Sequence, residues 1–196
     1  TSTLSDFKTT ENGGVIAATD GSGLNEVPVD VVITNGTNCE SYGGTMLDYY
    51  FEDYSSSTGA FTLWLETLDM SSSVDRTVLM YYGNSGALDL SDETGVFGAL
   101  DEVGVWNLHE DPATAGTHEI LDSSGQGNNG TDGGNPTSVT GKVGRGMDFD
   151  GVGDYIQTTS SELSGASEFT FLVWSTLSDN DITATERYNL LWQGDV

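Results

Sequence analysis

The fold of this chain is constrained most strongly by short runs in which apolar and polar residues alternate. Turns rich in glycine, serine and asparagine separate these runs. Residues 47–52 (Leu-Asp-Tyr-Tyr-Phe-Glu) and 61–66 (Phe-Thr-Leu-Trp-Leu-Glu) carry an apolar side chain at every second position. A period of two turns those side chains toward one side of an extended segment, as in a half-buried strand. Ser55-Ser-Ser-Thr-Gly59 between them is typical of a hairpin connection. We therefore expect the two segments to pair.

The rest of the chain follows the same pattern. No segment keeps an apolar period of 3.6 residues over three turns, and the 26 glycines favour turn-rich β architecture over helices. Further strands are expected at residues 15–19, 27–33 and 77–82, around Trp106, and at residues 147–150, 155–157, 169–174 and 187–192. The expected fold class is all-β.

The charge balance narrows the range of partners. The chain has 31 Asp and Glu against five Lys and Arg, a formal net charge of -26, which argues against binding nucleic acid through its phosphates. Two origins for this excess stay open. One is a halophilic source, because molar salt shortens the screening length to about 3 Å, and the other is an acidic secreted protein whose carboxylates are hydrated or hold calcium. No apolar run approaches the roughly 20 residues of a membrane span.

Three segments of the second half carry a resemblance to a known fold family. They are Val103-Gly-Val-Trp-Asn-Leu-His109, Asp122-Ser-Ser-Gly-Gln-Gly-Asn-Asn-Gly-Thr131 and Gly146-Met-Asp-Phe-Asp-Gly-Val-Gly-Asp-Tyr-Ile156. Their order resembles the LamG or concanavalin A-like jelly roll of prokaryotic and viral surface proteins. The resemblance implies a lectin-type β-sandwich, a scaffold that hosts binding modules, enzymes and spacers alike.

The first half carries a second resemblance. Its motifs are Asp53-Tyr-Ser-Ser-Ser-Thr-Gly59, Phe61-Thr-Leu-Trp-Leu-Glu-Thr-Leu68 and Asp75-Arg-Thr-Val-Leu-Met-Tyr-Tyr-Gly-Asn84. They look like a domain of unknown function that is often fused ahead of LamG jelly rolls. Residues 6–16 and 19–28 fit the opening half of that domain, and residues 35–44 look like an insertion.

We therefore expect two antiparallel β-sandwich (jelly-roll) domains in tandem. The first spans residues 1–100 and ends in a polar connector at 85–101, and the second spans residues 102–196. The second domain is expected to be incomplete, because the jelly roll it resembles needs more strands, and half a sandwich leaves strand edges unpaired. Either the sequence is a segment of a longer polypeptide, or a neighbouring chain completes the sheet.

The loop from Asp122 to Thr131 is the candidate metal site. It concentrates carboxylate, hydroxyl, amide and carbonyl oxygens, and Ca²⁺ takes six to eight oxygens from such groups. The resemblance to LamG jelly rolls also permits calcium. The candidate ligands are Asp122, Asn128, Asn129 and Asp150. The alternative is a plain turn, in which Gly and Asn supply backbone positions with positive φ.

Two tripeptides match the N-glycosylation acceptor pattern, Asn35-Gly-Thr37 and Asn129-Gly-Thr131. Asn35 is the favoured acceptor. A glycan on Asn129 would exclude that residue from binding metal.

Aromatic and sulfur-containing residues are assigned structural roles. All four tryptophans fall in expected strands, where core packing is favoured over sugar stacking: Trp64, Trp106, Trp174 and Trp192. No carbohydrate-binding residue is therefore assigned. The single Cys39 cannot form an intrachain disulfide, and a buried, inert thiol is favoured over a free or intermolecular one.

Catalysis finds little support in the sequence. Glucanases of the concanavalin A-like kind carry paired carboxylates on one strand, commonly as Glu-x-Asp-x-x-Glu, and this motif is absent. His109 and His118 have no Cys or His at zinc-ligand spacing, and there is no Gly-x-Ser-x-Gly motif. No catalytic residue is assigned, and the protein is expected not to be an enzyme.

Together these observations predict an extracellular adhesion or recognition module of a cell surface or virion surface. Its expected partner is a cell-surface glycan or glycoprotein, and its expected state is a homo-oligomer or larger assembly, since valency compensates for weak single-site binding. Two alternatives stay open. One is a structural or assembly protein of a virion or extracellular filament, and the other is a glycoside hydrolase whose catalytic acids lie beyond residue 196.

Overall fold

The computed structural model of the chain describes residues 2–3, 17–19, 26–36, 45–66, 71–98, 102–111, 119–158 and 166–176. Nearly all of the regular structure in these residues is antiparallel β-strand, so the expected all-β class is confirmed. No helix among them is long and apolar enough to cross a bilayer. The chain divides into two compact units, Thr1–Thr159 and Ser160–Val196. The boundary expected near residue 100 lies within the first unit, and the tandem of sandwich domains stays a prediction.

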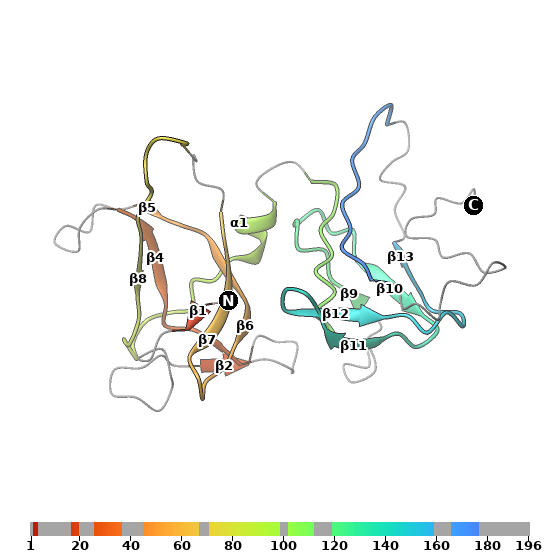
Figure 1. Ribbon diagram of the computed structural model, residues 1–196, viewed down its shortest axis with the longest axis horizontal. Coiled ribbons are helices and arrows are strands. Elements are labelled where there is room, and N and C mark those ends of the chain that lie inside the picture. The colour runs from red at the N-terminus through yellow and green to blue at the C-terminus, as the bar shows by residue number, and fades with distance from the viewer. Residues whose placement is uncertain are drawn as a thin grey trace. The chain divides into compact units, whose positions relative to one another are not determined.

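The hairpin expected from alternation is confirmed. Strands β6 (Tyr49–Tyr54) and β7 (Ala60–Leu65) pair antiparallel, and the register shifts between Phe51 and Asp53. The turn between them closes because the Ser55 carbonyl oxygen accepts from the Gly59 N–H at 2.8 Å, with Gly59 at φ +72°. Strand β1 (Ser2–Thr3) pairs with the other edge of β7, which gives the sheet order β1-β7-β6 (Figure 1).

The described residues of the first part of the fold form two further sheets. One has the order β5-β4-β8, and the other pairs β2 with β3. Their bounds are β2 (Ala17–Thr19), β3 (Glu26–Pro28), β4 (Val32–Asn35), β5 (Thr45–Met46) and β8 (Val78–Tyr81). The single strand expected at 27–33 is thus split by a bend at residues 29–30. The buried Asp30 explains the bend, since its carboxylate accepts from the Gly83 N–H at 2.8 Å.

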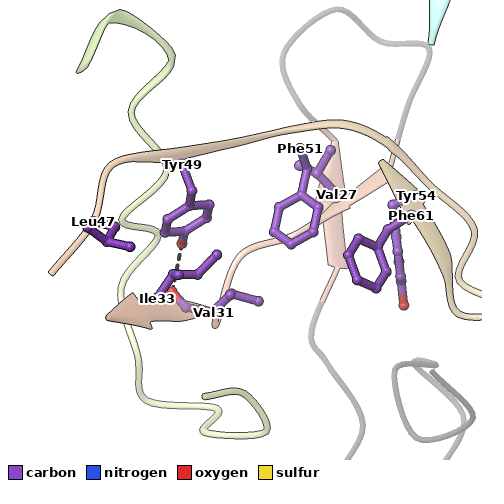
Figure 2. Close-up of a cluster of buried hydrophobic side chains, with 8 residues drawn as sticks. All are labelled: Val27, Val31, Ile33, Leu47, Tyr49, Phe51, Tyr54 and Phe61. Carbon is purple, nitrogen blue, oxygen red and sulfur yellow. Dashed lines mark hydrogen bonds between the residues drawn. The ribbon is translucent and has the colours of Figure 1, made fainter. Parts of the chain in front are cut away.

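The hydrophobic core joins side chains from these three sheets (Figure 2). Tyr49 and Phe51 of β6 are 1% and 2% exposed, and their rings meet edge to face with centroids 5.8 Å apart. The Tyr49 hydroxyl donates to the Val31 carbonyl oxygen at 2.6 Å, so its polar end is satisfied inside the core. The cluster comprises Val27, Val31, Ile33, Leu47, Tyr49, Phe51, Tyr54 and Phe61.

A short helix lies where the sequence predicts an irregular connector. Helix α1 (Glu93–Phe97) starts at Asp92, whose carboxylate accepts from the Gly95 N–H at 2.8 Å. Asp92 is a favourable N-cap, and its own N–H donates to the Tyr49 carbonyl oxygen at 2.9 Å, which fixes the helix start beside β6. Five residues are too few for the three-turn periodicity used to exclude helices, so the pattern could not reveal α1.

Among the described residues of the second half, two more antiparallel sheets form. One has the order β13-β10-β9, and the other is the hairpin of β11 and β12. The strand bounds are β9 (Glu119–Ile120), β10 (Gly130–Gly133), β11 (Thr137–Thr140), β12 (Arg145–Asp148) and β13 (Tyr155–Thr158). The strands expected at 147–150 and 155–157 correspond to β12 and β13, although β12 ends before Phe149.

Two expected strands are wrong. Residues 102–111 around Trp106 form no strand, and Leu108 explains why, because its φ of +56° interrupts an extended backbone. Residues 166–176, which include the expected strand 169–174, are likewise without a strand and are exposed throughout. Alternation predicts a strand only where a partner strand and a core are available. The strand expected at 187–192, together with Cys39, His118 and Trp192, lies outside the described residues.

Candidate functional site

Asp122 organises the loop that the sequence singled out. Its Oδ1 accepts from the Val105 N–H at 2.9 Å and from both the N–H and the hydroxyl of Ser124, at 3.0 and 2.6 Å. Its Oδ2 accepts from the Asn128 N–H at 2.9 Å. Burial alone would raise the pKa of Asp122, but these hydrogen bonds from Ser124, Val105 and Asn128 outweigh it and lower the pKa. The carboxylate therefore holds the turn as an anion.

The two asparagines of the loop also form hydrogen bonds to other residues of the chain. Asn128 donates its amide to the Val103 carbonyl oxygen at 2.7 Å and accepts from the Trp106 indole N–H at 2.9 Å. Asn129 accepts from the Asp122 N–H at 3.0 Å and donates to Glu119 at 2.8 Å. The structure thus brings Asp122, Asn128 and Asn129 together. The hydrogen bonds of these three residues within the protein, together with the positive φ of Gly125 and Gly127, are consistent with the plain-turn alternative.

Asp150, the fourth candidate ligand, belongs to a different turn. It is exposed, its Oδ1 accepts from the Val152 N–H at 2.7 Å, and its N–H donates to Asp154 at 2.9 Å. Asp154 also accepts from the Asn135 N–H, and these two backbone bonds lower its pKa. Within the described residues, no three His, Cys, Asp or Glu side chains are grouped so that they could hold a metal ion. Calcium binding stays a prediction.

Chelation tests the calcium prediction. If the Asp122 loop holds Ca²⁺, the melting temperature of the protein should be lower in EDTA than in CaCl₂, because binding to the folded state alone stabilises it. Substituting Asp122→Asn should then remove most of this difference. Calorimetry in the two buffers measures it, and equal melting temperatures for the wild-type protein would contradict calcium binding.

The glycosylation and tryptophan predictions have mixed outcomes. Asn35 is exposed at the end of β4, and its occupancy stays a prediction. Core packing is wrong for Trp64, which is 38% exposed on β7, and for Trp174, which is 79% exposed. Alternation along β7 turns Trp64 to the face opposite the core residue Phe61 and the core-packing Leu63, and Trp106 is half-buried over Gly104.

Trp64 belongs to a cluster on the outer face of the β6–β7 hairpin that sequence reasoning missed. Its ring meets Phe97 of α1 edge to face at 5.6 Å, and Phe97 meets Tyr50 at 6.3 Å. The Tyr50 hydroxyl lies 3.4 Å from Nδ1 of the buried His109. Residues far apart in sequence thus pack together on the outer face of this hairpin.

Glu52 is the buried acid of this cluster, with 4% of its surface exposed. Its Oε2 accepts from the Trp64 indole N–H at 3.0 Å, and the Arg145 backbone N–H also donates to it. Burial raises the pKa of Glu52, while Trp64, His109 and Arg145 oppose the rise. A side chain on Gly144 would overlap the Glu52 carboxylate, so the β11–β12 turn rests directly against β6.

Neutralising Glu52 should not destabilise the protein at pH 7. The pKa of Glu52 in the folded state is raised above its ordinary 4.5. The folded state therefore loses stability as the pH rises from 4.5 through the raised pKa. We expect Glu52→Gln, which keeps an acceptor for Trp64, to match or exceed the wild-type free energy of unfolding at pH 7. The advantage should vanish below pH 4.5. Urea denaturation at both pH values measures this, with the exposed neighbour Asp53→Asn as a charge-matched control, and a less stable Gln variant at pH 7 would contradict it.

Beside Glu52 lies a pocket of about 280 Å³, where β6 and β7 meet the β11–β12 turn. Asp53 and Lys142 are exposed and bring a carboxylate and an ammonium group, and two threonines bring hydroxyls. The turn that carries Lys142 is closed by a bond from the Gly141 N–H to the Gly144 carbonyl oxygen at 2.9 Å, with Gly144 at φ +57°. The lining residues are Asp53, Thr62, Thr140, Gly141, Lys142, Val143 and Gly144.

No sequence signal identified the pocket, because its residues come from two hairpins about 80 positions apart in the chain. The arrangement offers charged and neutral hydrogen-bonding groups around a space slightly smaller than the roughly 300 Å³ of small ligand pockets.

Residues 30–110 match a family described as a domain of unknown function, DUF2341. The resemblance of the first half to a domain of unknown function is therefore confirmed from residue 30 onward. The match runs past residue 100, and the fit of residues 6–28 to the same domain stays a prediction. No curated protein and no solved structure matches the chain. The LamG-like character of the second half stays a prediction. The DUF2341 match includes Asp53 and Thr62 of the pocket, while the β11–β12 turn lies outside it.

Proposed function

We propose that this chain is a non-catalytic recognition module of a cell surface or virion surface and that it binds carbohydrate. The observation that carries the proposal is the pocket between the β6–β7 hairpin and the β11–β12 turn. In this view the DUF2341-matched region and a LamG-like region form a tandem, and the ligand lies where their hairpins meet.

The chemistry of the pocket supports a sugar ligand. Sugar hydroxyls both donate and accept hydrogen bonds, and they need partners of both kinds. Asp53 accepts, Lys142 donates, and the hydroxyls of Thr62 and Thr140 do either. The pocket volume favours one sugar unit over an extended chain.

The carboxylates favour binding over hydrolysis. Most glycosidases flank the scissile bond with two carboxyl groups, one of which protonates the leaving oxygen. Asp53 is the one carboxylate among the residues that line this pocket. Glu52, the adjacent acid, has its Oε2 directed to Trp64.

A glycan array followed by titration tests the proposal. We expect the protein to bind a subset of glycans and Asp53→Ala to weaken that binding at least about tenfold, the loss typical of a charged hydrogen bond. Val152→Ala, at an 80% exposed position outside the pocket lining, should leave the affinity unchanged. An empty array, or binding that Asp53→Ala does not alter, would overturn the proposal.

A second candidate function, assembly, is favoured by the exposed apolar side chains of the second unit. Leu172 and Trp174 are 92% and 79% exposed, and Phe169 is 60% exposed. Exposed apolar side chains mark interaction surfaces where they form a contiguous patch, and these three are within six positions of one another in the sequence. Sedimentation at rising protein concentration distinguishes the candidates, because ordered self-association together with an empty glycan array would favour assembly over recognition.

A further inference from the structure

We infer that the pocket selects a sugar that carries a carboxylate, such as a uronic acid unit, and that Lys142 is its ion partner. This inference rests on the proposed carbohydrate function and names its substrate class.

Basic residues are scarce, and two of them lie together beside the pocket. The chain has five Lys and Arg against 31 Asp and Glu, and Lys142 and Arg145 are separated by only two residues. Arg145 supports the hairpin, because its Nε donates to the Ser138 hydroxyl at 2.7 Å and its backbone N–H donates to Glu52. Lys142 is exposed and is one of the residues that line the pocket, which leaves its ammonium group within reach of a ligand there.

The backbone of the turn determines where the Lys142 side chain leaves the chain. The Gly141 to Gly144 hydrogen bond closes the turn, and the positive φ of Gly144 together with its contact with Glu52 leaves no room for a side chain there. Two structural requirements thus place Lys142 in a closed turn that lines the same pocket as Thr62 and Thr140.

The two charges in the pocket define an orientation for the ligand. A sugar carboxylate is attracted to Lys142 and repelled by Asp53, while Asp53 accepts from sugar hydroxyls. The net charge of -26 opposes anions in general, but at physiological salt the screening length is about 8 Å. Remote carboxylates are therefore largely screened, whereas a direct contact with Lys142 is not.

Matched monosaccharides test the inference. Methyl β-D-glucuronide and methyl β-D-glucoside differ in one group, a carboxylate in place of a hydroxymethyl. By NMR titration of the full chain, we expect the wild-type protein to bind the glucuronide about two- to fivefold more tightly, the range for an exposed ion pair. Lys142→Gln should remove this preference by weakening glucuronide binding alone. Arg76→Gln, which makes the same charge change at an exposed position outside the pocket lining, should preserve it.

The outcomes separate this inference from the proposed function. Equal affinities, tighter glucoside binding, or a preference that survives Lys142→Gln would overturn the carboxylate inference while the carbohydrate function stands. Failure of both monosaccharides and of every glycan on the array would overturn both. Lys142 is exposed, so the variant should fold, and its circular dichroism spectrum checks this.

Discussion

Replacing Phe51 with alanine should lower the free energy of unfolding by about 3–5 kcal/mol, the usual cost of removing a buried aromatic ring. Phe51 is 2% exposed and meets the rings of Tyr49 and Phe61 edge to face, with centroids 5.8 and 5.9 Å away. The deletion leaves a cavity between sheets whose neighbouring side chains are held by their own contacts. Much of the stability of a small domain would be lost.

Urea denaturation followed by tryptophan fluorescence measures this loss. Leu88→Ala removes an apolar side chain of similar type at a position that is 77% exposed, and it should change the free energy of unfolding by less than about 0.5 kcal/mol. Equal effects of the two substitutions would show that the cluster around Phe51 is not the core.

Replacing Asp122 with alanine should destabilise the second half of the first unit by about 2 kcal/mol. The carboxylate accepts from three N–H groups and one hydroxyl, and its removal leaves partly buried donors at Val105 and Asn128 without their acceptor. The loop that carries Trp106 against Asn128 would lose its anchor.

The effect of Asp122 should depend on pH in a defined direction. Because its pKa is lowered in the folded state, its contribution is present above the ordinary value of 3.8 and is lost as the pH falls through the lower folded-state value. The stability gap between wild type and Asp122→Asn should thus shrink in strong acid. Urea denaturation at pH 7 and pH 3 measures the gap, and Asp75→Asn, at an exposed position, is the charge-matched control. A gap that grows on acidification would refute the role given to Asp122.

Local patterns predicted the strands that have a partner nearby. The β6–β7 hairpin followed from alternation and from the turn residues Ser55 and Gly59, and the same alternation placed Tyr49 and Phe51 in the core. The pattern failed at residues 169–174, where the same alternation is present but no strand forms. It also failed around Trp106, because nothing in the residue types signals the positive φ of Leu108.

The candidate site could not be predicted from local sequence patterns, for a different reason. Alternation puts Glu52 on the solvent side of β6, and only the arrival of Trp64 and the β11–β12 turn buries it. The pocket likewise needs Asp53 and Lys142 from separate hairpins. By contrast, Asp122 and Asn128 are close in sequence, so their closeness in space was predictable. Their hydrogen bond was not.

The most direct test of the account is to map a bound glycan on the full chain by backbone amide NMR. Saturation with the best ligand from the array should shift amide signals of Asp53, Thr62 and residues 140–144, and leave those of the Asp122 loop unchanged. Shifts confined to the Asp122 loop or to residues 166–176, with the pocket signals unmoved, would contradict the account.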